Sequence, residues 1–397
     1  MYSNIMVAVD NSQWSDWATD VAVDLARKMG ASLTGTHVYA AQLHGVRFRQ
    51  VEPGLPEQYQ TEEMLRRQRG IHHDLIGRGM GIISDSYLDV FEGKCRQAGL
   101  AARRKVFEGR HYVELVRDTE ESGYDLVVLG AHGLGRVGRS VLGSVCERVT
   151  RLVKCDALVV HDQRPLTCGP LAVALDGSAH SFAALRVALC LSHIYRNRVL
   201  AVAAYDPFFH GVAFRSLAGV LSGEAAKLFR FEAQERLHGE IIDDGLATVY
   251  RSHLLRAQAL AEKEGISIDI RVLRGKPFDA VASAVEEADP SLLLVGRVGL
   301  HHEAGVTLGS TAENLLRLAG CNVLVANQSA EKAEPEAVTM EANAVQPEGR
   351  WSEEARQRPG RVPLASSRTA VSSLARLLPA CARRYPGKRR PSPGSRR

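Results

Sequence analysis

Two glycine-rich segments of identical spacing are the parts of this sequence best suited to chemistry. The first reads GAHGLGRVGRSVLGS over residues 130–144, and the second reads GRVGLHHEAGVTLGS over residues 296–310. Each follows an apolar run of strand type and precedes a run of helical periodicity, so each is predicted to lead from a strand into a helix. Both fit the pattern G-x2-G-x9-G-S, whose fixed positions are Gly130, Gly133, Gly143, Ser144, Gly296, Gly299, Gly309 and Ser310.

This arrangement predicts a phosphate site. Glycine lets the backbone approach an anion closely and adopt positive φ, and successive backbone N–H groups form an anion-binding concavity. The start of the next helix adds unpaired N–H groups and the positive end of the helix dipole. Ser144 and Ser310 are expected either to cap that helix or to donate a hydroxyl group to a phosphate.

The two loops differ in charge. Between its second and third glycines the first loop carries Arg136 and Arg139 and no acid, whereas the second carries Glu303 with His301 and His302. Charge-assisted hydrogen bonds to phosphate are strong. The first loop is therefore predicted to bind a nucleotide more tightly than the second.

The other half of a nucleotide site is predicted at the ends of the first two strands of each half. Ligands of open α/β sheets bind beyond the carboxyl ends of the strands, where the strand order reverses. Asp10 and Asp176 end the first strands, and Val38 and Ala204 lie near the ends of the second. A carboxylate there can accept hydrogen bonds from ribose or adenine, although either Asp could instead cap the following helix.

These features recur because the chain contains an internal repeat. IMVAVDNS at residues 5–12 returns as LAVALDGS at residues 171–178, and the offset of 166 also relates Tyr39 to Tyr205 and Cys155 to Cys321. Within each repeat, strand-like runs that are apolar on both faces alternate with helical patterns. This predicts two tandem, doubly wound α/β domains with parallel sheets, over residues 1–163 and 168–328.

Each predicted domain carries a long insert, at about residues 41–99 and 206–265. The first is predicted to be helices broken by a glycine-rich turn at Gly77, Gly79 and Gly81, and the second contains one long amphipathic helix or two shorter ones over residues 224–263. Residues 329–397 are predicted to be a disordered basic tail. From residue 331 onward the chain has 14 Lys and Arg against 7 Asp and Glu, which leaves the rest with 36 against 38.

Composition narrows the possible functions. The basic charge lies in the tail, so it does not indicate a fold that binds nucleic acid specifically. No segment is apolar for long enough to be a membrane helix, and no secretion signal is evident. The seven dispersed cysteines favour a reducing cytoplasm.

His72 and His73 have no partner pair at metal-ligand spacing and are assigned to a solvated helix face. No catalytic set recurs in both repeats, so we expect the protein not to be an enzyme, although slow ATP hydrolysis stays open.

The sequence resembles the universal stress protein family in its tandem form. The resemblance rests on the two glycine motifs, on Asp10 and Asp176, and on the strand-two residues Val38 and Ala204. It covers both repeats. It implies a Rossmann-like fold, of the adenine-nucleotide α-hydrolase type, with five parallel strands in the order 3-2-1-4-5 in each domain. It also implies that the two domains pair within the chain, and leaves dimerisation of whole chains open.

The leading hypothesis is a cytoplasmic regulatory protein that binds ATP or AMP, with Mg²⁺, and changes a surface read by a protein partner. One alternative is a nucleotide-free interaction module that keeps the glycine loops only as turns. Another is an ATP-consuming enzyme of a related α/β fold. The sequence does not choose between ATP and AMP and does not identify the partner.

Overall fold

The computed structural model of the chain describes residues 2–207, 243–303 and 305–327. Its strands form one sheet in the order β3-β2-β1-β4-β5-β10-β9-β6-β7-β8. All pairings within the first five strands and within the last five are parallel, and β5 pairs with β10 in the antiparallel sense. The strands are β1 (Asn4–Ala8), β2 (Ser32–Tyr39), β3 (Ala102–Glu108), β4 (Leu126–Gly130), β5 (Asp156–Val160), β6 (Leu171–Ala174), β7 (Val199–Tyr205), β8 (Ile268–Arg274), β9 (Leu292–Gly296) and β10 (Asn322–Ala326).

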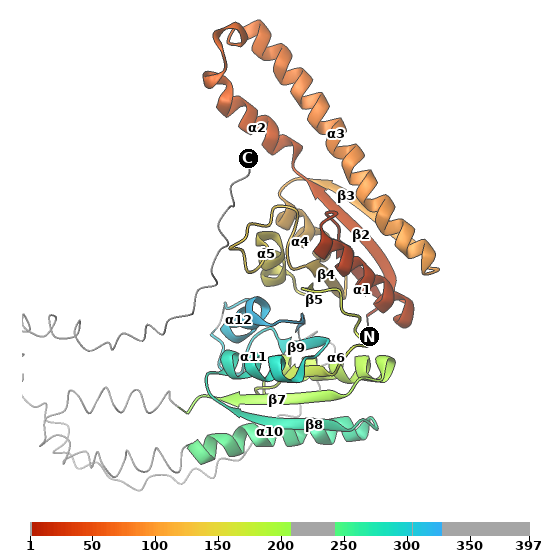
Figure 1. Ribbon diagram of the computed structural model, residues 1–397, viewed down its shortest axis with the longest axis vertical. Coiled ribbons are helices and arrows are strands. Elements are labelled where there is room, and N and C mark those ends of the chain that lie inside the picture. Colours follow the sequence, from red (N-terminus) through yellow and green to blue (C-terminus); the bar gives the residue numbers. More distant parts are fainter. Residues whose placement is uncertain (1, 208–242, 304, 328–397) are drawn as a thin grey trace, which may run out of the picture. The chain divides into compact units, whose positions relative to one another are not determined.

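Helices cover both faces of the sheet, and their labels can be followed in Figure 1. One core layer lies under α1 (Gln13–Met29), α3 (Glu62–Gln97), α6 (Ala179–Tyr195) and α10 (Asp243–Lys263). The opposite layer lies under α4 (His111–Ser122), α5 (Ser144–Leu152), α11 (Pro277–Ala288) and α12 (Ser310–Leu318). The predicted α/β class, a mainly parallel sheet between two helical layers, is therefore confirmed.

The apolar strands serve both layers because successive side chains point to opposite faces. In β4, Leu126 and Val128 join the first layer, whereas Val127 and Leu129 join the second. Helix α1 begins at Ser12, whose side chain accepts a hydrogen bond from Ser15 N, and the equivalent Ser178 begins α6 in the same way. Such caps satisfy N–H groups at a helix start that have no partner within the helix.

The two halves are joined about an approximate two-fold axis at β5 and β10. Leu158 pairs directly with Leu324, which is its own equivalent at the offset of 166, and Val159 and Ala157 pair with Val323 and Val325. A residue that pairs with its own counterpart lies on a two-fold axis. The repeat in the sequence therefore appears in space as a symmetric junction through the sheet.

The first insert differs from the prediction. The glycines at 77, 79 and 81 do not break a helix, because α3 continues through them from Glu62 to Gln97. The break falls earlier, between α2 (Ala41–Val51) and α3, where Pro53 and Pro56 accompany two short 3₁₀ turns. Proline removes a backbone donor and disrupts a helix, whereas glycine only weakens one. The continuous helix is held by four buried residues of its second half, Ser84, Leu88, Phe91 and Cys95.

Two other predicted segments lie partly or wholly outside the described residues. Of the second insert, α10 covers Asp243–Lys263, and residues 224–242 are not described. The predicted basic tail, residues 329–397, is not described either.

Replacing Gly79 with alanine is expected to stabilise the protein by up to about 1 kcal/mol, since alanine is the better helix former. No atom lies within 4 Å of a Cβ built on Gly79, so the methyl group has room. The free energy of unfolding in urea checks this. Gly35→Ala is the matched control with the opposite sign, because its Cβ would lie 2.6 Å from the Phe91 ring. A loss of stability in Gly79→Ala would contradict a continuous α3.

His161, at the carboxyl end of β5, predicts a loss of stability in mild acid. Burial, followed by the nearby His132, lowers the pKa of His161 to about 4. The unfolded chain therefore binds a proton near pH 6.5, whereas the folded chain resists it until about pH 4. The free energy of unfolding is therefore unaffected by this residue above pH 6.5. It falls by up to about 3 kcal/mol as the pH drops from 6.5 to about 4. Melting temperatures measured from pH 7 to 4 should fall less steeply for His161→Gln than for the native chain, and equal slopes would refute the assignment.

Candidate functional site

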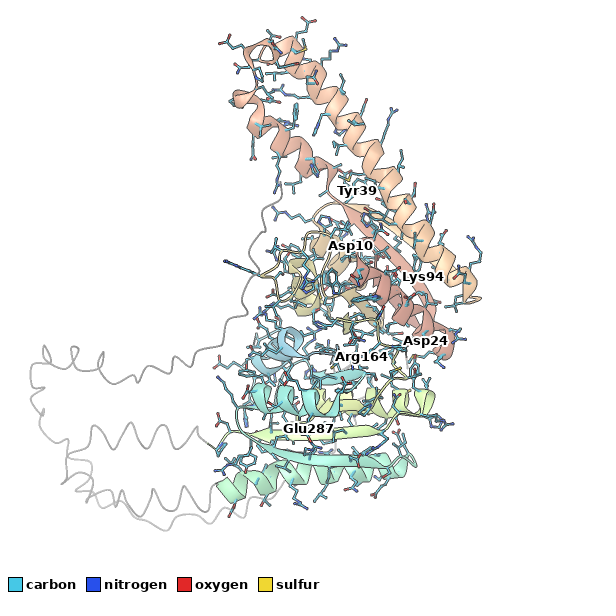
Figure 2. The ribbon with its side chains drawn as sticks, in the orientation of Figure 1. Asp10, Asp24, Tyr39, Lys94, Arg164 and Glu287 are labelled. Carbon is cyan, nitrogen blue, oxygen red and sulfur yellow. The ribbon has the colours of Figure 1, made fainter. Side chains whose placement is uncertain are left out.

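A cavity of about 740 Å³ opens beyond the carboxyl ends of β1, β2 and β4. Its walls include most residues predicted for the first site. Asp10 and Val38 come from the first two strands, and Arg136 and Ser144 come from the glycine loop and from α5. Figure 2 labels Asp10 at the end of β1 and Tyr39 at the end of β2, both of which line this cavity. The lining residues of the glycine segment include Gly130, Gly133 and Gly143.

The side chain of Asp10 joins the first strand to the glycine loop. Its Oδ1 accepts a hydrogen bond of 3.0 Å from Ser12 N, and its Oδ2 lies 2.5 Å from where a Cβ of Gly133 would stand. In the second half, Asp176 accepts from Ser178 N at 2.9 Å and from Leu300 N at 2.9 Å. The alternative that these carboxylates are the helix caps is wrong, because Ser12 and Ser178 occupy the N-cap positions.

The glycines of the first motif are required by close packing rather than by unusual backbone angles. A Cβ on Gly130 would meet the backbone of α1 at 2.7 Å, and one on Gly143 would lie 3.0 Å from the carbonyl oxygen of Ala131. Neither these two glycines nor Gly133 has a positive φ. The predicted use of positive φ at these positions is therefore wrong, and only the close approach remains. Positive φ occurs instead at Asn11 (φ 60°) and Gly177 (φ 88°), just after the strand-one Asp of each half, and at Gly305 (φ 92°), which lies in the second glycine loop but is not one of its motif glycines.

The helix after each loop begins one residue earlier than a serine cap requires. Gly143 and Gly309 are the N-caps, without a side-chain cap, so Ser144 and Ser310 are the first helical residues. The capping role predicted for these serines is wrong, and their hydroxyl groups stay candidates for contact with a phosphate. Since the first N–H groups of a helix have no partner within it, the start of α5 presents donors at the edge of the first cavity.

The two arginines of the first loop lie in different places. Arg136 lines the cavity, with its guanidinium 4.8 Å from the ring centre of Trp14. Both arginines are exposed, but Arg139 is not among the lining residues. The geometry thus makes Arg136 the candidate phosphate ligand and does not place Arg139 at the site.

The helical insert supplies a wall of the first cavity that the sequence analysis did not anticipate. His44 lies on α2, and Met80, Ile83 and Tyr87 lie on α3. Tyr87 packs edge-on against His37, with 5.2 Å between ring centres. The three α3 residues are spaced three and four positions apart, which is the signal of one helix face. A helix broken at the glycines would not place these three residues on one face, so this wall of the cavity does not follow from the predicted break.

The surroundings of two histidines in the first cavity favour their neutral form. Burial, and then the neighbouring His37, lowers the pKa of His111 below its ordinary value, although the charge of Asp10 acts in the opposite direction. Burial, followed by Arg136, lowers the pKa of His132. Neutral imidazoles do not repel a cation and do not add positive charge for a phosphate. Arg136 is then the charged group of this cavity best suited to an anion.

The second cavity, of about 530 Å³, repeats the plan with different side chains. The predicted residues Asp176, Ala204, Gly296, Gly299, Gly309 and Ser310 all line it. His301, His302 and Glu303 also line it, whereas the insert contributes only Tyr250 from the part of the chain that the structure describes. Arg297 also lines this cavity, but its guanidinium already donates to Thr150 O at 3.0 Å and to Thr307 O at 3.3 Å.

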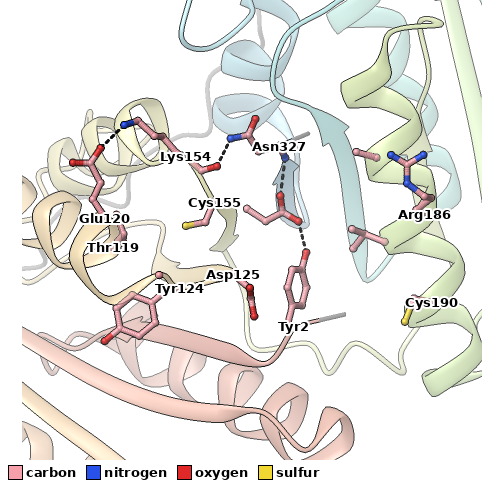
Figure 3. Close-up of a pocket in the computed structure, with 14 residues that line it drawn as sticks. Tyr2, Thr119, Glu120, Tyr124, Asp125, Lys154, Cys155, Arg186, Cys190 and Asn327 are labelled. Carbon is pink, nitrogen blue, oxygen red and sulfur yellow. Dashed lines mark hydrogen bonds and ion pairs between the residues drawn. The ribbon is translucent and has the colours of Figure 1, made fainter. Parts of the chain in front are cut away.

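A third cavity of about 580 Å³ lies between the two halves, beside α6 (Figure 3). The Asp carboxylates that line it already accept hydrogen bonds. Asp156 accepts from Tyr2 Oη at 2.6 Å and from Asn327 N at 2.7 Å. Asp125 accepts from Ser3 N at 2.6 Å and from two further donors. Burial raises the pKa of the Cys155 thiol to about 12, so it is protonated and unreactive at neutral pH. These groups hold the junction together and do not form a reactive set.

The predicted solvated helix face holds for His73, which is exposed, whereas His72 is partly buried. The ring of His72 stacks on that of Phe48, with 4.5 Å between centres. Among the described residues no three His, Cys, Asp or Glu side chains form a group suited to a metal ion. The helices in the same residues include none that is long and apolar enough to cross a membrane.

The fold and the two cavities define a class of protein, a tandem of doubly wound α/β domains with one glycine loop in each domain, between β4 and α5 and between β9 and α12. The family model described as "Universal stress protein family" matches residues 1–161 and again residues 169–327. The chain therefore belongs to the universal stress protein family.

Individual relatives agree with this assignment. The universal stress protein YxiE of Bacillus subtilis is 26% identical over 166 residues, which are 40% of this chain and 99% of that protein. A universal stress protein from Archaeoglobus fulgidus resembles 82% of this chain and 98% of its own, with a TM-score of 0.53 and 16% identity. A putative universal stress protein from Pseudomonas aeruginosa has the same TM-score, with 12% identity and coverage of 82% and 93%. At these identities, the two structures show the fold alone.

Proposed function

We propose that this chain is a nucleotide-responsive regulatory protein that binds ATP or AMP in the first cavity. The observation that carries the proposal is that one cavity is lined by Asp10, by the glycine loop with Arg136, and by the start of α5. Acceptors for a sugar and donors for phosphates therefore face the same space. Its volume of about 740 Å³ lies within the usual range for small-molecule sites, roughly 300–1,000 Å³.

In this proposal each group has a role that follows from its chemistry. The N–H groups at the start of α5 and the Ser144 hydroxyl would bind phosphate oxygens, with Arg136 opposing their charge. Asp10 would accept from the ribose, and Val38 would pack against the base. Mg²⁺ would accompany the phosphates of ATP, as it usually does. Binding would draw the glycine loop toward the ligand and change the surface that a protein partner reads in the cytoplasm.

We do not propose catalysis. The described residues that line the first cavity include no lysine, so the cavity lacks the lysine that phosphoryl-transfer sites of the P-loop type use. The chemistry of the site is therefore better suited to holding a nucleotide than to turning one over.

Titration calorimetry of the full chain with Mg-ATP and with AMP, followed by chromatography of the nucleotides, tests this proposal. We expect saturable binding with the nucleotide recovered unchanged over the titration. No binding of either nucleotide would favour the interaction module whose glycine loops are only turns. Rapid stoichiometric conversion of ATP with a co-substrate would favour the enzyme.

A further inference from the structure

Arg297 links the second glycine loop to the first domain. It follows β9 directly and is only 6% exposed. Its Nη1 donates to Thr150 O at 3.0 Å, to Arg151 O at 3.4 Å and to Thr307 O at 3.3 Å, and its Nη2 donates to Cys155 O at 3.4 Å. Thr307 belongs to its own loop, whereas the other three acceptors lie at the end of α5 and just beyond it. One guanidinium therefore bridges the two domains.

The carboxyl end of α5 is a favourable place for the positive charge of Arg297. The last carbonyl groups of a helix have no partner within it and carry the negative end of the dipole, so a buried cation is stabilised there. Burial alone lowers the pKa of Arg297, and the neighbouring Cys155 and Asp156 oppose that shift. An arginine remains charged in such a site. Removing it would leave buried carbonyl groups without donors.

The other end of the same helix faces the first candidate site. Ser144 to Glu147, the first turn of α5, line the first cavity. At nine residues and about 1.5 Å per residue, α5 is a short rigid rod of about 13 Å. A ligand that displaces the amino end of α5 also displaces its carboxyl end. Arg297 links that carboxyl end to the second glycine loop.

The first half has no equivalent bridge. The residue that corresponds to Arg297 at the offset of 166 is Ala131, which is fully buried. Two ion pairs beside this bridge are symmetric, since Glu147 pairs with Arg317 at 2.7 Å and Glu313 pairs with Arg151 at 2.9 Å. These side chains are a quarter to a third exposed, and such pairs contribute little.

We propose that Arg297 couples the two candidate nucleotide sites, because it ties the second glycine loop to the helix whose first turn contacts the ligand of the first site. This inference rests on the proposed function. Coupling between sites is reciprocal, so occupancy of either site changes the affinity of the other. Arg297 lies in the wall of the second cavity, but its Nη1 and Nη2 donate to backbone carbonyl groups, so it acts as a positioning residue.

Hydrogen exchange of the full chain during a titration with Mg-ATP reads each site separately. Protection of residues 131–142 gives the midpoint of the first site, and protection of residues 297–308 gives that of the second. Disabling the first site with Gly143→Val should move the second midpoint by at least about fivefold, the lower end of ordinary coupling. In the Arg297→Gln background the same change should move it by less than about twofold.

Two further variants separate coupling from general weakening of the junction. Arg317→Gln removes the partly exposed ion pairs with Glu147 and Glu313 at the same junction and should keep the shift. Arg297→Lys keeps the charge but cannot reach all four carbonyl groups, and should retain part of the shift even if Arg297→Gln unfolds. An equal shift in the native and Arg297→Gln backgrounds, or no shift in the native background, would overturn the coupling. Failure of ATP to protect either loop would instead overturn the proposed function, and the coupling with it.

Discussion

Replacing Gly143 with valine is expected to weaken Mg-ATP binding at the first site by at least about a hundredfold, in a protein that still folds. A Cβ there would lie 3.0 Å from Ala131 O and 3.2 Å from His132 Cα. The loop must then move away from the start of α5. Losing two charge-assisted hydrogen bonds to phosphate costs about 3 kcal/mol or more, which corresponds to roughly a hundredfold in affinity. Calorimetry of the variant measures the loss.

The control lies in the same loop. Gly138 has no atom within 4 Å of a built Cβ, so Gly138→Val adds an equal side chain without displacing the loop. We expect its affinity to stay within about threefold of the native value, since the change touches no proposed contact. Native affinity in a folded Gly143→Val chain would show that the loop does not hold the nucleotide.

The second large expected effect is an inequality between the sites, with ATP binding at least about tenfold more tightly at the first. One additional phosphate contact worth about 1.4 kcal/mol is enough for that ratio. The first cavity has Arg136 on its wall, whereas the second has Glu303 and Arg297, and the guanidinium of Arg297 already donates to backbone carbonyl groups. The net charge presented to phosphates therefore differs between the two sites.

The halves should be compared within the full chain, because β5 and β10 pair across the junction and Arg297 spans it. Gly309→Val leaves only the first site and Gly143→Val only the second, and the affinity of each variant for Mg-ATP is measured by calorimetry. Within the first site, Arg136→Gln should lower the affinity for Mg-ATP about tenfold. Arg139→Gln should lower it little, because Arg139 does not line the cavity. Equal affinities of the two single-site chains, or tighter binding by the second, would refute the charge argument.

The sequence was sufficient for the fold because the evidence for it is local and repeated. Apolar strands alternating with helical patterns predict the layers, and an offset of 166 that recurs along the chain shows the duplication. The cavity residues at the carboxyl ends of the strands could also be predicted, since parallel strands bring Asp10, Val38 and the glycine loop to one edge.

Features that depend on contacts distant in the sequence could not be predicted in this way. Nothing in the residues around Arg297 shows that its side chain turns toward α5, because its acceptors there lie more than 140 positions earlier. The role of Gly130 in packing on Trp14 is equally invisible, since a glycine needed for contact and one needed for a turn look alike. The three glycines predict a break in α3, but the buried face that includes Leu88 and Phe91 keeps the helix continuous.

The most direct test of the account is to denature the freshly purified full chain and identify any released nucleotide by mass, before and after incubation with Mg-ATP and removal of the excess. The account predicts ATP or AMP released from the native chain, with much less from the Gly143→Val/Gly309→Val double variant. Nucleotide-free native protein that stays free after incubation, or equal release from the double variant, would contradict it.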